Sequence, residues 1–302
     1  MIEPAKRSAG PPAEQGFVLV AALWLLAALA SLAVIFSIYL SSSARAISVN
    51  DMALRAEALA SACVELTAYQ LHLAGADSRP PQGSFQTRLN GAELRVSFAS
   101  EAARIDLNAA PKELLAGLLS VLGASEDDAE QGAGRIIAWR SRADAEAVGH
   151  EDALYRAAGR PYSPRQAPFA HVNELALVLG LSPPLVERAL PFVTVFSGAK
   201  GIDAMIAAPE VIAALPGVTP LLLKQFLGDR ARLAGDANAV AAALGPAKAS
   251  ATGKSSAYRI RIIIRFPDGR QAVSEVVIGV GGGDDPYKVL SWQDGVDRER
   301  RG

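Results

Sequence analysis

The sequence predicts an α+β protein in which a long N-terminal helix packs on a small antiparallel sheet, with a large helical segment inserted between the strands. Three observations support this class. Residues 17–40 contain no charged side chain, apolar and polar positions alternate in residues 84–100 and 257–280, and the chain between these two stretches carries helix signals. Strands on both sides of a helical segment indicate one sheet with an insert.

The apolar stretch at residues 17–40 reads FVLVAALWLLAALASLAVIFSIYL. As a helix it would be about 36 Å long, which is enough to cross a bilayer. A secretory signal peptide is the alternative, but its apolar core would be shorter and a small-residue cleavage site would follow it. We therefore expect one transmembrane helix after a leader of residues 1–16. Lys6 and Arg7 place this leader in the cytoplasm, so everything after the helix lies across the membrane.

The helix is expected to continue through residues 41–75, because no proline or glycine occurs before Gly75. Apolar residues recur there at helical spacing, at Ile47, Leu54, Ala58, Ala62, Leu66, Tyr69 and Leu73. This stripe is the face that we expect to pack on the globular part of the chain. Cys63 on the same helix is interpreted as a small apolar packing residue, since a single cysteine forms no internal disulfide.

The sheet is predicted from residues 76–102 and 257–302. The first segment alternates around Asn90-Gly91, a strong hairpin signal. Its expected apolar face is Phe85, Leu94, Val96 and Phe98. The second segment alternates as YRIRIIIRF, turns at Asp268-Gly269 and continues as QAVSEVVIGV, and PYKVLSWQD adds a last strand. On its first strand three arginines face away from the apolar side: Arg259, Arg261 and Arg265.

Residues 103–230 are predicted to form the helical insert, and residues 231–256 a polar, flexible connector. IDLNAAPKELLAGLLSVLG has Asn108 as a helix-cap candidate and Pro111 in the first turn. AGRIIAWRSR, HVNELALVLGL and PLVERALPFVTVF predict further helices. GIDAMIAAPEVIAALPGVTPLLLKQFLGDR repeats the features of the first unit, since both place a hydrophobic-aspartate pair, then alanine and proline, before a leucine-rich helix. We interpret this as an internal repeat of about ninety-five residues.

Composition argues against several function classes. The net charge is −1, so the chain as a whole has no general attraction to nucleic acid or acidic lipid. The three histidines, at positions 72, 150 and 171, share no metal-ligand spacing with one another or with Cys63. No phosphate loop, paired-histidine motif or nucleophile with a base is recognisable. An enzyme is therefore not predicted.

The N-terminus resembles a known class of leader. A short polar leader that ends in glycine, followed by phenylalanine and an apolar helix, is similar to the class III leader of type IV pilins and type II secretion pseudopilins. The resemblance implies that a prepilin peptidase cuts between Gly16 and Phe17 and methylates the new N-terminus at Phe17. The fifth mature position, which is usually glutamate, is Ala21. Its usual carboxylate neutralises the terminal ammonium of a neighbouring subunit, and the K-type minor pseudopilin at the fibre tip typically lacks it.

The insert also resembles that of the K-type subunit. IDLNAAP, IIAWR, the GHEDALY loop, RPY and HVNELALVLG match in order and spacing. The resemblance implies a pseudopilin fold whose insert has two SAM-like or helix-hairpin-like units. It further implies a non-enzymatic subunit that initiates or caps the periplasmic fibre tip for protein export across the outer membrane. The implied partners are the I- and J-type minor pseudopilins, the prepilin peptidase and the inner-membrane secretion platform, and the protein would be single-pass in the bacterial inner membrane with a periplasmic C-terminal domain.

Calcium is the one ligand that the resemblance implies. The family insert carries an acidic loop after a Trp-Arg pair and a Gly-x-Glu-Asp loop soon afterwards, and carboxylate oxygens suit this cation. Here Trp139-Arg140 is followed by Ser141 in place of the usual aspartate. The remaining candidate ligands are Asp144, Glu151 and Asp152. Solvated loop acids are the alternative interpretation.

Two alternatives remain, a minor pilin of a type IV pilus and a membrane-anchored helix-hairpin-helix receptor for DNA uptake. The DNA-binding modules use a Gly-hydrophobic-Gly turn, whereas residues 216–219 read PGVT and residues 123–125 read GAS. Residues 101–200 also hold ten Lys and Arg against thirteen Asp and Glu, a net charge of −3 that would repel a polyanion. Nucleic acid is therefore not a predicted partner. Neighbouring genes would separate the type II system from the type IV system.

Overall fold

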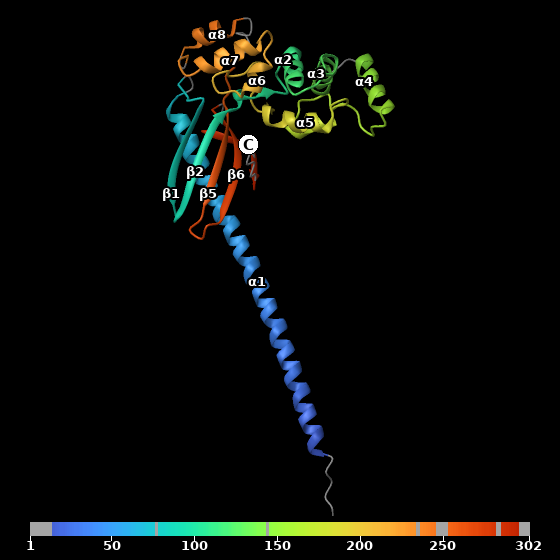
Figure 1. Ribbon diagram of the computed structural model, residues 1–302, viewed down its shortest axis with the longest axis vertical. Coiled ribbons are helices and arrows are strands. Elements are labelled where there is room, and N and C mark those ends of the chain that lie inside the picture. The colour runs from blue at the N-terminus through green and yellow to red at the C-terminus, as the bar shows by residue number, and fades with distance from the viewer. Residues whose placement is uncertain are drawn as a thin grey trace, which may run out of the picture. The chain divides into compact units, whose positions relative to one another are not determined.

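The computed structural model covers the 302-residue chain and describes residues 14–75, 78–142, 145–233, 236–245, 253–281 and 285–295. The chain divides into two units, Met1–Ala58 and Leu59–Gly302, and each is described by itself. The first contains the leading part of helix α1 (Glu14–Leu73). The second contains the rest of α1, a sheet and a set of short helices (Figure 1).

Helix α1 continues for 60 residues because nothing in its sequence stops it. Between Gly16 and Gly75 there is neither proline nor glycine, the two residues that most weaken a helix interior. Gly75 ends the helix with a φ of 71°, the left-handed conformation that terminates many helices. The predicted helix over residues 17–73 is confirmed.

Five antiparallel strands form one sheet in the order β1-β2-β5-β6-β7. Their bounds are Gln82–Leu89 (β1), Ala92–Ser100 (β2), Ala257–Arg265 (β5), Gln271–Val280 (β6) and Tyr287–Asp294 (β7). Asn90 and Gly91 join β1 to β2 with φ values of 50° and 80°, since a two-residue turn of this kind needs positive φ at both positions. Both predicted hairpins and the last strand are confirmed.

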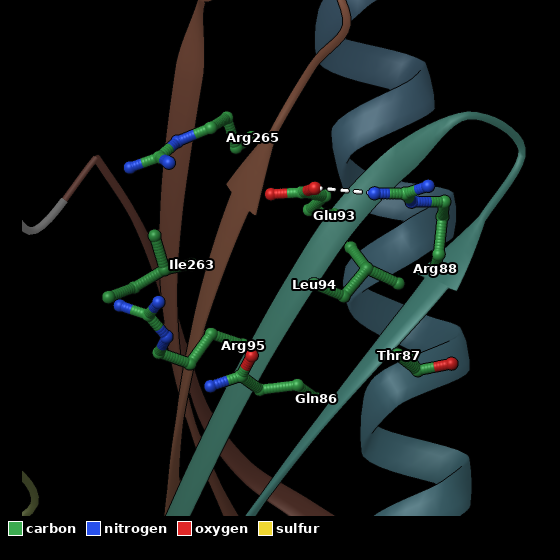
Figure 2. A pocket seen from close by; sticks show the side chains of 8 residues that line it. All are labelled: Gln86, Thr87, Arg88, Glu93, Leu94, Arg95, Ile263 and Arg265. Carbon is green, nitrogen blue, oxygen red and sulfur yellow. Dashed lines mark hydrogen bonds and ion pairs between the residues drawn. The ribbon is translucent and has the colours of Figure 1, made fainter.

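One face of the sheet is covered by α1 from Leu59 onward, as Figures 1 and 2 both show. The core between them contains side chains exposed by 1 % or less: Ala60, Val64 and Leu71 on the helix, and Val96, Ile260, Ile262 and Ile264 on the strands. Arg79 joins the end of the helix to the sheet, because Nε donates to the carbonyl of Leu71 (3.1 Å) and Nη1 to that of Val280 (3.2 Å). The sheet therefore presents one covered face and one open face.

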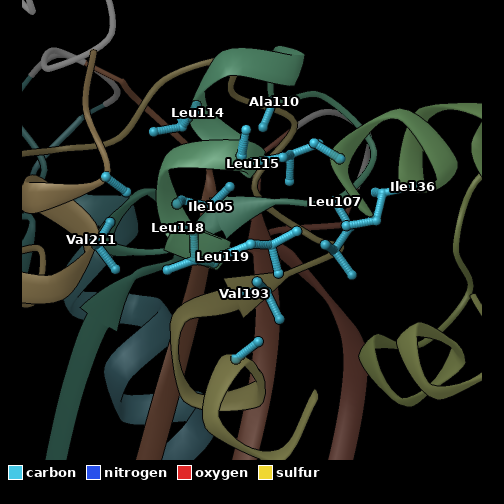
Figure 3. Close-up of a cluster of buried hydrophobic side chains, with 14 of the residues drawn as sticks. Ile105, Leu107, Ala110, Leu114, Leu115, Leu118, Leu119, Ile136, Val193 and Val211 are labelled. Atoms are coloured by element: carbon cyan, nitrogen blue, oxygen red, sulfur yellow. The ribbon is translucent and has the colours of Figure 1, made fainter. Parts of the chain in front are cut away.

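Between β2 and β5 the chain forms the insert. Its elements are η1 (Glu101–Ala103), β3 (Ile105–Asp106), α2 (Lys112–Val121), α3 (Glu126–Arg140), α4 (Ala145–Ala157), η2 (Val172–Leu177), α5 (Pro183–Ala189), η3 (Leu190–Phe192), β4 (Val193–Thr194), α6 (Pro209–Ala213), α7 (Pro220–Asp229) and α8 (Ala237–Leu244). The short strands β3 and β4 pair in parallel. Leucine, isoleucine and valine side chains from these elements meet in a single core, part of which Figure 3 shows.

Two predicted loop segments are helical. The GHEDALY stretch, expected as a loop, lies in α4, where Tyr155 is 1 % exposed and its hydroxyl accepts from the amide of Leu179 (2.9 Å). The connector predicted over residues 231–256 contains α8, whose first turn is capped by Asp236 and whose Val240 and Leu244 are buried. In both segments a few anchored side chains stabilise a helix that composition alone did not indicate.

Two predicted helix features are also corrected. Asn108 does not cap α2, because its side chain exchanges two hydrogen bonds with the backbone of Phe169 (2.7 and 3.0 Å) and Pro111 occupies the cap position. The HVNELALVLGL segment forms only the 3₁₀ helix η2, which His171 caps. A left-handed Gly180, with a φ of 84°, follows within a few residues and prevents a longer helix there.

The two helical units meet at Gly117 in α2. A Cβ added there would overlap the carbonyl oxygen of Ala214, which follows α6. Changing Gly117 to alanine should therefore separate the two helices and lower the free energy of unfolding by about 1–3 kcal/mol.

Gly134 in α3 offers a matched control for this substitution. A Cβ there would meet only the side chain of Lys112, at 3.7 Å. Gly134→Ala should raise stability by about 0.5–1 kcal/mol, because alanine favours a helix interior more than glycine does. Denaturant unfolding of the full chain in detergent would measure both. Equal effects of the two substitutions would contradict the tight contact at Gly117.

Candidate functional site

The apolar part of α1 is the first candidate functional surface. Val18–Tyr39 form a 22-residue segment of mean hydropathy 2.7, the one helix in the described part of the chain that is long and apolar enough to cross a membrane. Its side chains are exposed, including Trp24 at 74 %. The Ser31 hydroxyl donates to the carbonyl of Ala27 (2.8 Å) and so needs no partner outside the helix. The segment has the length and chemistry of a single membrane span.

The residues predicted to be processed lie at the start of this helix. Gly16 and Phe17 are in the first turn of α1, and residues 1–13 lie outside the described residues. Ala21 follows one turn later with an exposed side chain, and no acidic residue occurs between positions 18 and 39. No other carboxylate in this part of the helix replaces the missing one. The cut between Gly16 and Phe17 stays a prediction.

The later part of α1 corrects one sequence prediction. The stripe expected to pack on the globular part points outward: Leu66, Tyr69 and Leu73 are 39 %, 61 % and 66 % exposed. The buried face is instead Leu59, Ala60, Cys63, Val64, Thr67, Ala68 and Leu71. Small side chains there allow the helix to approach the sheet closely. Apolar periodicity correctly predicted a helix but did not distinguish the face that packs on the sheet from the face that stays open.

Two residues on α1 show how the buried and open faces differ. Burial raises the pKa of the Cys63 thiol to about 11, which fits the packing role predicted for it. On the open side, Glu65 accepts a hydrogen bond from the Tyr287 hydroxyl of β7 (2.7 Å), and burial together with this bond raises the pKa of Tyr287 to about 12. Leu66, Tyr69 and Leu73 also lie on the open side. They are three and four residues apart, so they form one apolar stripe along the helix.

A buried carboxylate joins the sheet to the insert. Glu101, the first residue after β2, is fully buried. Its Oε1 accepts from Nε of Arg259 on β5 (2.8 Å) and from Nη1 of Arg104 (2.8 Å). Its Oε2 accepts from Nη2 of Arg259 (3.0 Å) and from the hydroxyl of Thr194 on β4. Arg259 in turn pairs with Glu275 on β6, so one ion network spans both parts of the second unit.

Charge complementarity keeps this network ionised. Burial by itself would raise the pKa of Glu101, but the hydrogen bonds and charge of Arg259, together with Arg104 and Thr194, outweigh it and lower the pKa. Burial likewise opposes the charge on Arg259, while the hydrogen bonds and charges of Glu101 and Glu275 raise its pKa. The sequence prediction had placed Arg259 only on an outward face and had not identified Glu101 as its partner.

The two helical units repeat one arrangement of hydrogen bonds. In the first unit, Asp106 accepts from the amide of Asn108 (2.7 Å), and Arg140 at the end of α3 donates to the carbonyls of Leu107 (2.5 Å) and Ala110 (2.6 Å). A single arginine thus satisfies two backbone acceptors in the turn before α2.

The second unit repeats this arrangement with another aspartate and arginine. Asp203 accepts from the amide of Met205 (2.9 Å), and Arg230 after α7 donates to the carbonyls of Ala204 (2.5 Å) and Ala207 (2.6 Å). These carbonyls lie one and four residues after the aspartate, as in the first unit. Burial raises the pKa of both aspartates. The shared pattern supports the internal repeat that the sequence predicts.

The calcium candidates are only partly described. Asp144 lies outside the described residues, and Glu151 and Asp152 are half-buried neighbours on α4. Asp152 Oδ1 is buried and has no hydrogen-bond partner among the described residues, which suits a cation ligand. Adjacent positions on a helix project about 100° apart, so the pair alone does not enclose an ion. Among the described residues no group of three potential metal ligands occurs.

The turns within the helical units bear on DNA binding. Gly123 and Gly217 both have positive φ (96° and 81°), and each precedes a capped helix, with Ser125 at the start of α3 and Thr219 at the start of α7. The first turn of α3 carries the acids Glu126, Asp127 and Asp128. Negative charge at the helix N-terminus would repel a phosphate that approached this turn.

Comparison with known proteins agrees with this architecture. Residues 88–198 match the family model of type II secretion system (T2SS) protein K. The resemblance to type II secretion protein K is confirmed. The matched span runs from the end of β1 through the first helical unit to β4, so it includes Glu101 and the first arginine-braced turn. No curated protein matches the chain.

A solved structure shows a similar fold. A chain in the crystal structure of the GspK-GspI-GspJ complex from the enterotoxigenic Escherichia coli type 2 secretion system superposes with a TM-score of 0.60. The two chains share 18 % identity, and the match covers 82 % of this chain and 98 % of the other. The predicted α+β class, with an N-terminal apolar helix and an antiparallel sheet, is confirmed at this level.

The Glu101 network predicts a specific dependence of stability on pH. Because the folded-state pKa of Glu101 is lowered, the carboxylate contributes fully above its unfolded-state pKa of about 4.3, and the contribution is lost as pH falls through the folded-state pKa. Glu101→Gln should cost about 3–5 kcal/mol at neutral pH, because it leaves two arginines without their buried counter-charge. The cost should shrink as the medium is acidified.

Glu93→Gln is the control, because Glu93 pairs with Arg88 on the surface (2.6 Å) with both side chains more than half exposed. That substitution should change stability by less than about 1 kcal/mol. Denaturant unfolding of the full chain in detergent, followed by Trp139 and Trp292 fluorescence, measures both. If the wild type and Glu101→Gln lost stability in parallel on acidification, the carboxylate would not be the ionised centre of the network.

Proposed function

We propose that this chain is a K-type minor pseudopilin, a non-enzymatic structural subunit that initiates or caps the periplasmic fibre of a type II secretion system during protein export. The observation that carries the proposal is the match of residues 88–198 to the protein K family. The position of that match supports it, because the matched residues run from the end of β1 through β2 into the insert, and the sheet packs on the later part of α1.

The N-terminal helix supplies the anchor in this proposal. The leader of residues 1–16 stays in the cytoplasm with Lys6 and Arg7, α1 crosses the inner membrane, and the folded unit lies in the periplasm. A prepilin peptidase removes the leader between Gly16 and Phe17 and methylates Phe17. The inner-membrane secretion platform then receives the mature chain.

Alanine at position 21 supports a location of this subunit at the tip of the fibre. A subunit with a carboxylate at the fifth position can neutralise the terminal ammonium of its neighbour inside the apolar fibre core, where an unpaired charge is costly. Alanine there offers no such pairing. The chain would accept subunits on one side of the helix bundle and leave no subunit beyond it.

The partners in this proposal are the I- and J-type minor pseudopilins. The similar fold is that of a chain in a solved GspK-GspI-GspJ complex. In this chain the open stripe of Leu66, Tyr69 and Leu73 provides an apolar surface for a neighbouring helix. Side chains three and four residues apart form the kind of ridge that helices pack against one another.

The stripe can be tested by co-purification. We expect the double variant Leu66→Asp/Tyr69→Asp to recover about tenfold less of the co-expressed I- and J-type subunits from detergent-solubilised membranes, because two buried apolar contacts would be replaced by charges. Circular dichroism should show an unchanged fold, since both side chains are exposed.

Leu89→Asp is the matched control for that experiment. Leu89 is an apolar residue at the end of β1, 46 % exposed and outside the stripe on α1. It should leave the recovery of both subunits unchanged. Normal recovery with the stripe variant, or an equal loss with the control, would exclude the stripe as the docking surface.

Calcium binding by the α4 segment is a second part of the proposal. The buried, partner-free Oδ1 of Asp152 supports it, with Glu151 and Asp144 as the other carboxylates. Calorimetry of the full chain in detergent should detect binding at millimolar calcium or below, and Asp152→Asn should weaken it. Absence of heat at millimolar calcium, with the protein folded, would remove calcium from the scheme.

A further inference from the structure

The open face of the sheet, on the side away from α1, carries a cluster of arginines around one apolar residue. Arg261, Ile263 and Arg265 occupy every second position of β5 and so share one face. Arg95 on β2 lies directly opposite Ile263 in the strand register. Figure 2 shows Arg95 and Ile263 side by side on this face, with Arg265 further along β5 and the helix behind the sheet. We call Arg95, Arg261 and Arg265 with Ile263 the arginine face.

Two carboxylates neighbour the arginines of this face in the strand register, Glu93 opposite Arg265 and Glu275 opposite Arg261, but in the described structure both pair with other arginines. Other basic residues nearby are paired: Arg259 with Glu101 and Glu275, and Arg88 with Glu93 (2.6 Å). Arg95, Arg261 and Arg265 form no ion pair with any described residue. The whole chain has a net charge of −1, so the cluster does not follow from a basic composition. Even with Glu93 and Glu275 counted, arginines outnumber carboxylates along the two hollows on this face, so the surface is positive and a bound anion would relieve the repulsion.

The surface is shaped to receive a ligand. Arg95, Ile263 and Arg265, together with the Arg88–Glu93 pair, line a shallow hollow of about 440 Å³. Arg261 lies beside a neighbouring hollow that also includes Arg104. Ile263 is only half-buried although it stands in the centre of the sheet, so an apolar group of a ligand can cover it.

The spacing of the charges indicates the form of the ligand. Arg261 and Arg265 are four residues apart on one strand, about 13 Å, with Ile263 between them. A second extended chain has the same repeat, so carboxylates four residues apart would reach both arginines while the side chain between them covers Ile263. Guanidinium groups bind carboxylates through paired hydrogen bonds, which favours this match over a diffuse attraction.

We propose that the arginine face binds an acidic extended segment of a neighbouring protein subunit, one with two carboxylates four residues apart and an apolar residue midway between them. The identity of the neighbour as a fibre subunit rests on the proposed function, whereas the binding chemistry rests on the face itself. Three arginines around an apolar centre suit such a segment better than duplex DNA, whose affinity depends on many phosphate contacts.

The experiment uses the full chain in a non-ionic detergent at low salt and a fluorescein-labelled peptide of sequence SESVSES. Fluorescence anisotropy should detect saturable binding that weakens as sodium chloride is raised, because salt screens exposed charges. Arg95→Gln/Arg261→Gln/Arg265→Gln should raise the Kd about tenfold or more. Arg142→Gln/Arg160→Gln/Arg232→Gln removes the same charge from exposed positions elsewhere and should leave the Kd unchanged.

Two further probes test the class of ligand. A peptide of the same composition with its two glutamates adjacent should bind several-fold more weakly. A duplex DNA oligonucleotide and anionic lipid vesicles should bind no more tightly than SESVSES. No binding of SESVSES at about 5 mM, equal loss with both triple variants, equal binding of the two peptides, or tighter binding of DNA or vesicles would each overturn the proposal.

Failure here and failure of the proposed function can be told apart. If the chain still co-purifies with the I- and J-type subunits while SESVSES does not bind, the arginine face has no such role but the assembly function stands. If SESVSES binds and those subunits do not co-purify, the face binds an acidic segment of another protein.

Discussion

The buried carboxylate of Glu101 is the constraint on which the second unit depends. The insert leaves the sheet after Ser100 and returns at Ala257, and these ends lie on adjacent paired strands. An insert attached at two neighbouring points would turn about its attachment unless something fixed it. Glu101 fixes it, because the same carboxylate is bound by Arg259 of the sheet and by Thr194 of the insert. Buried pairs of this kind specify an arrangement more than they add stability.

Inside the insert, both helical units are stabilised by the same set of hydrogen bonds. An arginine at the end of the second helix of each unit satisfies two carbonyls in the turn before the first helix, and an aspartate orders the same turn from within. The two units then meet where Gly117 lets a helix touch the backbone near Ala214. The two units therefore share the hydrogen bonds of the turn before their first helix, whereas their helices differ in length.

In the described part of the chain, the candidate functional features are surfaces. An apolar helix suits a bilayer, an apolar stripe on α1 suits another helix, and the arginine face suits a carboxylate-bearing segment. Each exposes apolar side chains or like charges that a bound partner or a bilayer would cover or neutralise. Such a distribution is what a subunit of an assembly requires, since its contacts with neighbours replace the substrate contacts of an enzyme.

The sequence predicted helices and strands well where residues close together in the chain determine them. The uninterrupted α1 and the Asn90-Gly91 hairpin follow from residues close in the chain. The outward stripe of α1 was assigned to the wrong face, because periodicity does not show which apolar side meets the sheet. Glu101 was missed because its partner Arg259 is 158 positions away and is read locally as an outward residue of an alternating strand.

In the proposed function, assembly through α1 begins with the free N-terminus that cleavage of the leader would create. N-terminal mass spectrometry of the membrane form, from cells with and without prepilin peptidase, examines that step directly. We expect a chain that starts at methylated Phe17 when the peptidase is present and an uncut leader when it is absent. Retention of Met1 in cells that contain the peptidase, or a cut at any bond other than Gly16–Phe17, would contradict the assignment of this chain as a minor pseudopilin.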